Sequence, residues 1–116
     1  MAIGDTDTGV AQNGDGQLEL WANNQELMNL DTSNITSYKN IIPSANDTHD
    51  LGTTSARWRN IYTQDLQLSN EAKKDKGGND VDGTWGDWTL QEGEEEIFMI
   101  NNRTGKKYAM MLREVA

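Results

Sequence analysis

The feature that most constrains this chain is residues 51–62, where a tight turn precedes a large aromatic anchor. Leu51 is followed by Gly-Thr-Thr-Ser, then by Trp58 between two arginines, and then by the pair Ile61-Tyr62. A Trp side chain carries a large apolar area and usually packs against neighbours. Because the rest of the chain offers little core material, this segment indicates a surface repeated by symmetry rather than a self-sufficient monomer.

Core-forming residues are scarce throughout the sequence. Leu, Ile, Val and Phe make up about 17% of the 116 residues, and the formal net charge is −9. These values are typical of disordered chains, but four Trp, three Tyr and several alternating runs favour β-strands. Small domains with thin cores need disulfides, metals or oligomerisation. With no Cys and no apparent metal cluster, the composition predicts an oligomer that uses no cofactor.

Polar stretches divide the chain into four predicted parts. The first is an extended N-terminal arm, residues 1–16, with Ile3 and Val10 as candidates for attachment to another protein of the same particle. The clearest break is a run with three Lys and a Gly-Gly pair, which predicts a linker or an exposed loop. The remaining parts are therefore a β-rich module at residues 17–69, the linker or loop at residues 70–83, and a C-terminal β-hairpin module at residues 84–116.

The 17–69 module begins with a predicted hairpin. Residues 17–21 and 26–30 alternate polar and apolar side chains, and Asn23-Asn24 between them favours a tight turn. A further short strand is expected at residues 35–42, where Pro43 stops it or confines it to a sheet edge. Extended chain is then expected at residues 58–63 and 65–69.

The C-terminal module is expected to contain three strands. They are predicted at residues 84–90, 96–101 and 106–115, with residues 102–105 as the hairpin turn and Gly105 at a positive-φ position. Both faces of the last strand carry apolar side chains, so it is either sandwiched or partnered across an oligomer. Acidic Glu92 and residues 94–96 could pair across strands or between subunits with Arg103, Lys106, Lys107 and Arg113.

Three segments of the chain resemble tail fibre and tail spike proteins of tailed bacteriophages, especially those of marine phages. Residues 51–62 are similar to a recurring Leu-Gly-(Ser/Thr)…Arg-Trp…Ile-Tyr element, and residues 18–28 and 80–108 are similar to other parts of such proteins. The resemblance implies an all-β fold of short strands and hairpins in an elongated, fibre-like homotrimer. It also implies a virion protein that is assembled in the host cytoplasm.

The resemblance further implies partners and surfaces. The partners would be sibling chains, other virion tail or fibre proteins, and a bacterial surface glycan or protein receptor. Trp85 and Trp88 are the candidates for receptor contact, because exposed rings stack on sugars and nearby glycines leave Trp85 accessible. The alternative is that they fill the thin core and the contacts between subunits. The residues predicted to pack between copies are Leu18, Leu20, Met28, Leu30, Trp58, Ile61, Tyr62, Leu66, Leu68, Phe98, Ile100, Tyr108, Met110 and Leu112.

Other classes of function find little support in the sequence. His49 is the one histidine and there is no Cys, so no catalytic triad is recognisable and we expect no enzyme. Asp-rich turns fail the EF-hand pattern, because its twelfth position would be Ala22. The acidic balance argues against nucleic acid as partner, and no apolar run approaches the roughly 20 residues that span a membrane. A signal peptide is not expected at the first residues. The alternative function is a tail or head adaptor, or a decoration protein, with a purely structural role.

Overall fold

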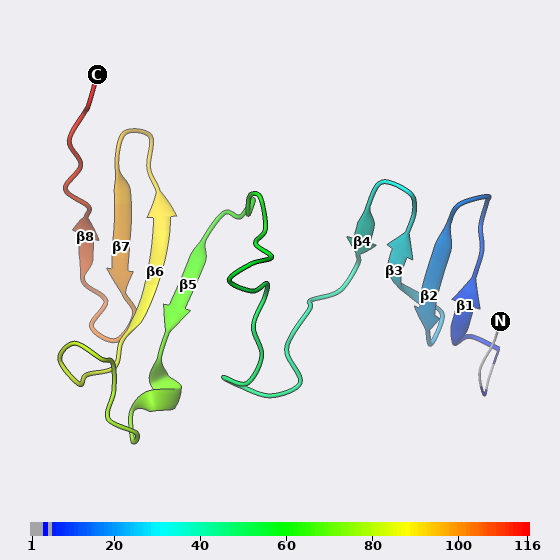
Figure 1. Cartoon of the computed structure of the whole chain (residues 1–116), viewed down its shortest axis with the longest axis horizontal. Coiled ribbons are helices and arrows are strands. Elements are labelled where there is room, and N and C mark those ends of the chain that lie inside the picture. The colour runs from blue at the N-terminus through cyan, green and yellow to red at the C-terminus, as the bar shows by residue number, and fades with distance from the viewer. Residues whose placement is uncertain (1–3, 5) are drawn as a thin grey trace. The chain divides into compact units, whose positions relative to one another are not determined.

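The computed structural model describes residue 4 and residues 6–116, and its fold is all-β (Figure 1). The chain forms two compact units, the first ending at Ser44 and the second running Ala45–Ala116. Each unit contains one four-stranded antiparallel sheet whose strands are neighbours in chain order. The predicted fold class is confirmed at this level.

The first sheet is a meander of β1 (Gly9–Ala11), β2 (Leu18–Ala22), β3 (Gln25–Leu30) and β4 (Ile35–Ser37). Asn23 and Asn24 have φ values of 48° and 59°, as a two-residue hairpin turn between twisted strands requires. The predicted β2–β3 hairpin is therefore confirmed. Two local expectations were wrong: part of the predicted arm forms β1, and the strand expected at residues 35–42 ends at Ser37.

The second sheet is formed by β5 (Leu66–Ser69), β6 (Asp87–Glu92), β7 (Ile97–Asn101) and β8 (Lys107–Ala109). The β7–β8 turn is confirmed, with Gly105 at φ 77°. Residues 70–83 contain the short 3₁₀ helix η1 (Glu71–Lys73) and connect two neighbouring strands of this sheet. The predicted 17–69 module thus contributes to both units.

Two expected strands of the second unit differ in extent from the structure. The strand expected at residues 84–90 begins only at Asp87, and the return strand expected at residues 106–115 is limited to Lys107–Ala109. Residues 58–63, expected as extended chain, contain no strand and bend at Arg59. Alternation alone did not reveal these limits, because a strand also needs a neighbouring backbone with which to pair.

Strand register gives each sheet one apolar face. Directly paired residues of antiparallel strands project to the same side. The first apolar face, on β1–β4, consists of Val10, Leu18, Leu20, Met28, Leu30 and Ile35. The second apolar face, on β5–β8, consists of Leu66, Leu68, Trp88, Leu90, Ile97, Met99 and Tyr108.

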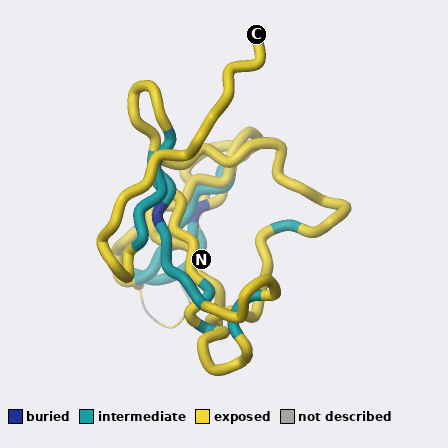
Figure 2. The backbone as a smooth tube through the Cα atoms, turned by 90° about the vertical axis from the view of Figure 1, so that its left-hand side faces the viewer, coloured by how far each residue is buried: buried dark blue, intermediate teal, exposed yellow. Residues whose placement is uncertain are grey.

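No hydrophobic residue is buried anywhere in the described part of the chain. Figure 2, in which buried residues are dark blue, shows nearly the whole backbone as exposed or intermediate. The buried residues are the polar Glu19 and Thr89, which register places on the sides opposite the two apolar faces. A single copy therefore has sheets but no hydrophobic core.

The polar side of the second sheet is a hydrogen-bonded network. The Thr89 hydroxyl lies 2.7 Å from Gln67 Oε1, and the Asn102 amide lies 3.0 Å from the Thr89 hydroxyl and 2.9 Å from Asp87 Oδ1. These contacts link β5, β6 and the end of β7. This side satisfies its polar groups within the chain, so the apolar side is the one that needs a partner.

Candidate binding site and assembly surface

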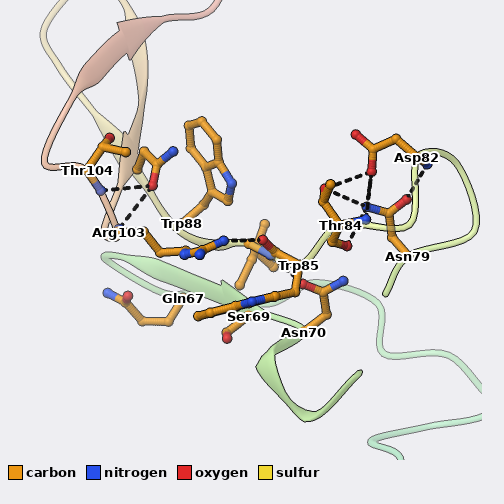
Figure 3. Close-up of a pocket in the computed structure, with 13 residues that line it drawn as sticks. Gln67, Ser69, Asn70, Asn79, Asp82, Thr84, Trp85, Trp88, Arg103 and Thr104 are labelled. Carbon is orange, nitrogen blue, oxygen red and sulfur yellow. Dashed lines mark hydrogen bonds between the residues drawn. The ribbon is translucent and has the colours of Figure 1, made fainter. Parts of the chain in front are cut away.

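A recess of about 1030 Å³ opens at one end of the second sheet (Figure 3). Its lining comes from the end of β5, the loop before β6, the start of β6 and the β7–β8 turn. Aromatic rings, amides, hydroxyls and one guanidinium line it, among them Trp85, Trp88, Asn79, Thr84, Arg103 and Thr104. Ligand sites typically combine apolar rings with a few placed polar groups in this way.

Trp85 and Arg103 both line the recess and contact each other. The guanidinium carbon of Arg103 lies 3.8 Å from the centroid of the Trp85 ring, and Figure 3 shows the Arg103 side chain over that ring. Arg103 Nη1 also donates a 2.8 Å hydrogen bond to the Trp85 carbonyl oxygen. Such cation–π contacts contribute about 0.5–1 kcal/mol at exposed sites. The pair therefore joins the β7–β8 turn to the loop before β6.

Trp88 enters the recess from β6. A Cβ added to Gly86 would lie 2.8 Å from Trp88 Nε1, so only glycine leaves room for the indole in this position. The Trp88 ring also contacts Tyr108, with centroids 5.7 Å apart and planes tilted by 47°. Trp88 thus belongs to the second apolar face as well as to the recess.

Asn79 organises the loop that carries Trp85. Its Nδ2 donates to Asp82 Oδ1 at 2.7 Å and to the Thr84 carbonyl oxygen at 2.8 Å. Its Oδ1 accepts the backbone N–H groups of Val81 and Asp82 at 2.7 and 2.9 Å. A short Asn side chain favours turns through such bonds to nearby backbone. These bonds fix the turn that immediately precedes Trp85.

We expect this loop to loosen in acid. Hydrogen bonds from the Thr84 hydroxyl and then from the Asn79 amide hold the pKa of Asp82 below its ordinary value. A lowered pKa means that the contribution to stability is present above the unfolded pKa and is lost as pH falls through the folded one. Carboxyl NMR titration should give Asp82 a lower pKa in the protein than in a peptide of residues 79–84. Equal values would contradict this role.

The predicted packing residues fall into three groups in the structure. Leu18, Leu20, Met28 and Leu30 all lie on the first apolar face, and Leu66, Leu68 and Tyr108 lie on the second. Phe98 and Ile100 project to the opposite side of the second sheet, because they pair with Ala109 and Lys107. The remaining five predicted packing residues lie outside the strands and are exposed: Trp58, Ile61, Tyr62, Met110 and Leu112.

Sequence reasoning missed three members of the second apolar face, namely Leu90, Ile97 and Met99. Trp88 also lies on this face, as the packing alternative for the tryptophans expects. The alternation of β7 was visible in the sequence, but register decides which of its faces aligns with Tyr108. Of the two attachment candidates, Val10 lies in β1 opposite Leu20, and Ile3 lies outside the described residues. Trp85, expected to be exposed, is half-buried.

The acidic residues before β7 have no cationic partner among the described residues. Neither Glu92 nor residues 94–96 form an ion pair, and the cross-strand pairs expected with Arg103, Lys106, Lys107 and Arg113 do not form in the described structure. The intersubunit alternative remains a prediction. In residue 4 and residues 6–116, no cluster of His, Cys, Asp or Glu has the makeup of a metal site. The described chain also contains no helix with the length and hydropathy to cross a bilayer.

Comparison with known proteins relates segments of the chain to phage tail fibres. The chain is 49% identical over 41 residues to the long tail fiber protein Gp37 of Enterobacteria phage K3. It is 44% identical over 41 residues to the long tail fiber protein Gp37 of Enterobacteria phage T2. Each match covers 35% of this chain and 3% of the relative. A probable tail fiber protein of Escherichia phage P2 is 33% identical over 61 residues, which are 53% of this chain and 9% of that protein.

These matches are local. The chain spans less than a tenth of the length of the relatives it matches. No protein-family model and no solved structure matches the chain. The predicted resemblance to phage tail fibre proteins is confirmed by these partial matches, since all three relatives are tail fibre proteins of bacteriophages.

Proposed function

We propose that this chain is a structural component of a phage tail fibre and that it assembles as a homotrimer. The observation that carries the proposal is the pair of apolar sheet faces in a chain that buries no hydrophobic residue among those described. Sheets with one apolar side must cover that side against another layer. The tail fibre homologues favour sibling chains as that layer.

The energetics favour assembly. Fully burying a large apolar side chain contributes about 1.5–3 kcal/mol, and the two apolar faces together offer more than ten such side chains. Association costs an estimated 4–15 kcal/mol in translational and rotational freedom. Even half-burial of these side chains between copies would offset that cost. The threefold symmetry rests on the resemblance to fibre proteins, since a second copy alone would also cover a flat face.

We propose that the recess around Trp85 contributes to host adhesion, with a surface glycan or protein as receptor. Its indole ring, guanidinium and amides offer stacking and hydrogen bonds together. On this proposal the chain acts without catalysis, resides in the virion with other tail proteins, and is assembled in the host cytoplasm. Imaging of intact particles with a label on this chain should place it in a tail fibre; a position between head and tail would favour an adaptor role.

The adhesive role predicts a specific loss of binding. Trp85→Ala removes the ring that Arg103 covers, so we expect binding of the purified protein to host cells to fall at least about tenfold, the effect of 1.4 kcal/mol. Val81→Ala is the matched control, because Val81 is 96% exposed on the same loop and does not line the recess. Unchanged host binding by a folded Trp85→Ala protein would contradict adhesion at this recess.

A further inference from the structure

Residues 57–63, hereafter the docking segment, lie outside the strands and form no backbone pairing. None of them makes a backbone–backbone hydrogen bond in the described structure, and none belongs to a strand. Its apolar side chains are exposed: Trp58 by 62%, Ile61 by 71% and Tyr62 by 92%. Three large apolar side chains so close together on one exposed segment are characteristic of an interaction site.

The turn before the docking segment is well ordered. The Thr53 N–H donates to the Ala56 carbonyl oxygen, and the Ala56 N–H donates to Thr53 Oγ1, both at 2.9 Å. Gly52, at φ 89°, lies close to the Trp58 ring, since a Cβ there would be 3.7 Å from Trp58 Cδ1. The ordered turn therefore holds the beginning of the docking segment in place, while the Trp58 side chain stays 62% exposed. A preordered segment with an uncovered apolar side chain is suited to docking, because little entropy is lost on binding.

The second sheet offers a surface with complementary properties. Its apolar face is uncovered within the same compact unit that contains the docking segment. Charge is complementary as well: Arg57 and Arg59 flank Trp58, while Glu92 lies on the apolar side by register and residues 94–96 follow in the β6–β7 turn. None of these charged groups is ion-paired with another residue that the structure describes. Complementary charges of this kind fix the orientation of partners.

The length of the chain favours the second sheet over the first as the target. Leu66 follows Trp58 by eight positions, so at about 3.3–3.6 Å per residue Trp58 stays within roughly 30 Å of its own β5. If copies pack side by side, with the same residues next to each other, the second sheet of the neighbouring copy lies within that distance of Trp58. A contact that pairs two different surfaces of identical chains is head-to-tail, and it closes when the rotation forms a ring.

We infer that the docking segment of one copy lies across the second apolar face of the neighbouring copy, with Arg57 and Arg59 beside that copy's acidic β6–β7 turn. This inference rests on the proposed homotrimer. It assigns Trp58, Ile61 and Tyr62 to an intersubunit contact and names the strands that receive them. It also accounts for unpaired charges on both sides of the contact.

Disulfide trapping tests the inference directly, because the chain has no Cys of its own. Ile61→Cys is combined in turn with Leu66→Cys, Leu68→Cys, Leu90→Cys or Met99→Cys, and a bond forms only where the two Cα atoms come within about 7 Å. Mild oxidation should link chains up to three times 13.0 kDa in at least one pair. The matched controls are Gln67→Cys, Thr89→Cys and Gln91→Cys on the opposite side of the same strands.

A charge exchange provides a second measurement that leaves the apolar contact intact. The double variant Arg57→Glu, Arg59→Glu should raise the protein concentration at which half of the trimers dissociate at least about tenfold, which corresponds to 1.4 kcal/mol. Adding Glu92→Lys and Glu94→Lys to that variant should return this concentration to the value of the parent protein. A protein that is trimeric by light scattering but gives no interchain disulfide in any of the four pairs, or links equally well in the controls, would overturn the docking. A protein that is monomeric would instead overturn the proposed function.

Discussion

Leu68→Asp should abolish the trimer. Leu68 is 46% exposed in a single copy, so in a monomeric protein this substitution would cost only about 1 kcal/mol, mainly through the lost cross-strand contact with Trp88. In the proposed assembly the same side chain is covered by another copy, and each trimer would bury three unpaired carboxylates at a cost of several kcal/mol each. The two accounts therefore predict very different outcomes for one substitution.

The measurement is the mass in solution by light scattering, together with the melting temperature by circular dichroism. Gln67→Asp is the matched control, since Gln67 precedes Leu68 on β5 and faces the opposite side. That control loses the contact between Gln67 Oε1 and the Thr89 hydroxyl, worth about 1 kcal/mol, and should remain trimeric. If Leu68→Asp keeps both the mass and the melting temperature of the parent, the second apolar face is not an interface.

Gly78→Ala should cause the largest loss of stability within a single copy. Gly78 has φ 68°, and a Cβ there would meet the Gly83 carbonyl group well inside van der Waals contact. The backbone conformation alone costs about 1–2 kcal/mol for alanine, and the overlap is with main chain that has no rotamer to relieve it. The 79–84 turn must then open. Opening breaks the hydrogen bonds of Asn79 and lets Trp85 move.

Gly77→Ala separates the two causes. Gly77 has φ 94°, but nothing lies within 4 Å of a Cβ at this position, so only the conformational cost remains. We expect the melting temperature to fall modestly for Gly77→Ala and much further for Gly78→Ala, with amide NMR shifts extending to Trp85 in the second variant alone. Equal effects of the two substitutions would contradict the close approach of Gly78 and Gly83.

The sequence was sufficient to predict elements whose signals are local. The Asn23-Asn24 turn and the turn at Gly105 need left-handed backbone that Asn and Gly adopt readily, and both hairpins follow from them. Strand β1 was missed because Gly9–Ala11 is short and carries one large apolar residue. It becomes a strand only because β2 offers an edge with which to pair.

Properties that depend on register or on distant contacts could not be predicted. Whether Phe98 or Met99 shares a face with Tyr108 depends on the alignment of β7 with β8, and a shift of one residue reverses the answer. The contact between Trp85 and Arg103 joins residues 18 apart in sequence through the packing of a loop against a turn. Trp58 was predicted to pack against another chain. Its ring is exposed in a single copy, so that contact stays a prediction.

The central claim is that sibling chains supply the core which one copy lacks. Its most direct test is the mass of the purified, folded protein at micromolar concentration by light scattering. The account predicts a single species at three times the 13.0 kDa chain mass. A cooperatively folded species at 13.0 kDa, with the sheets intact by circular dichroism, would contradict it.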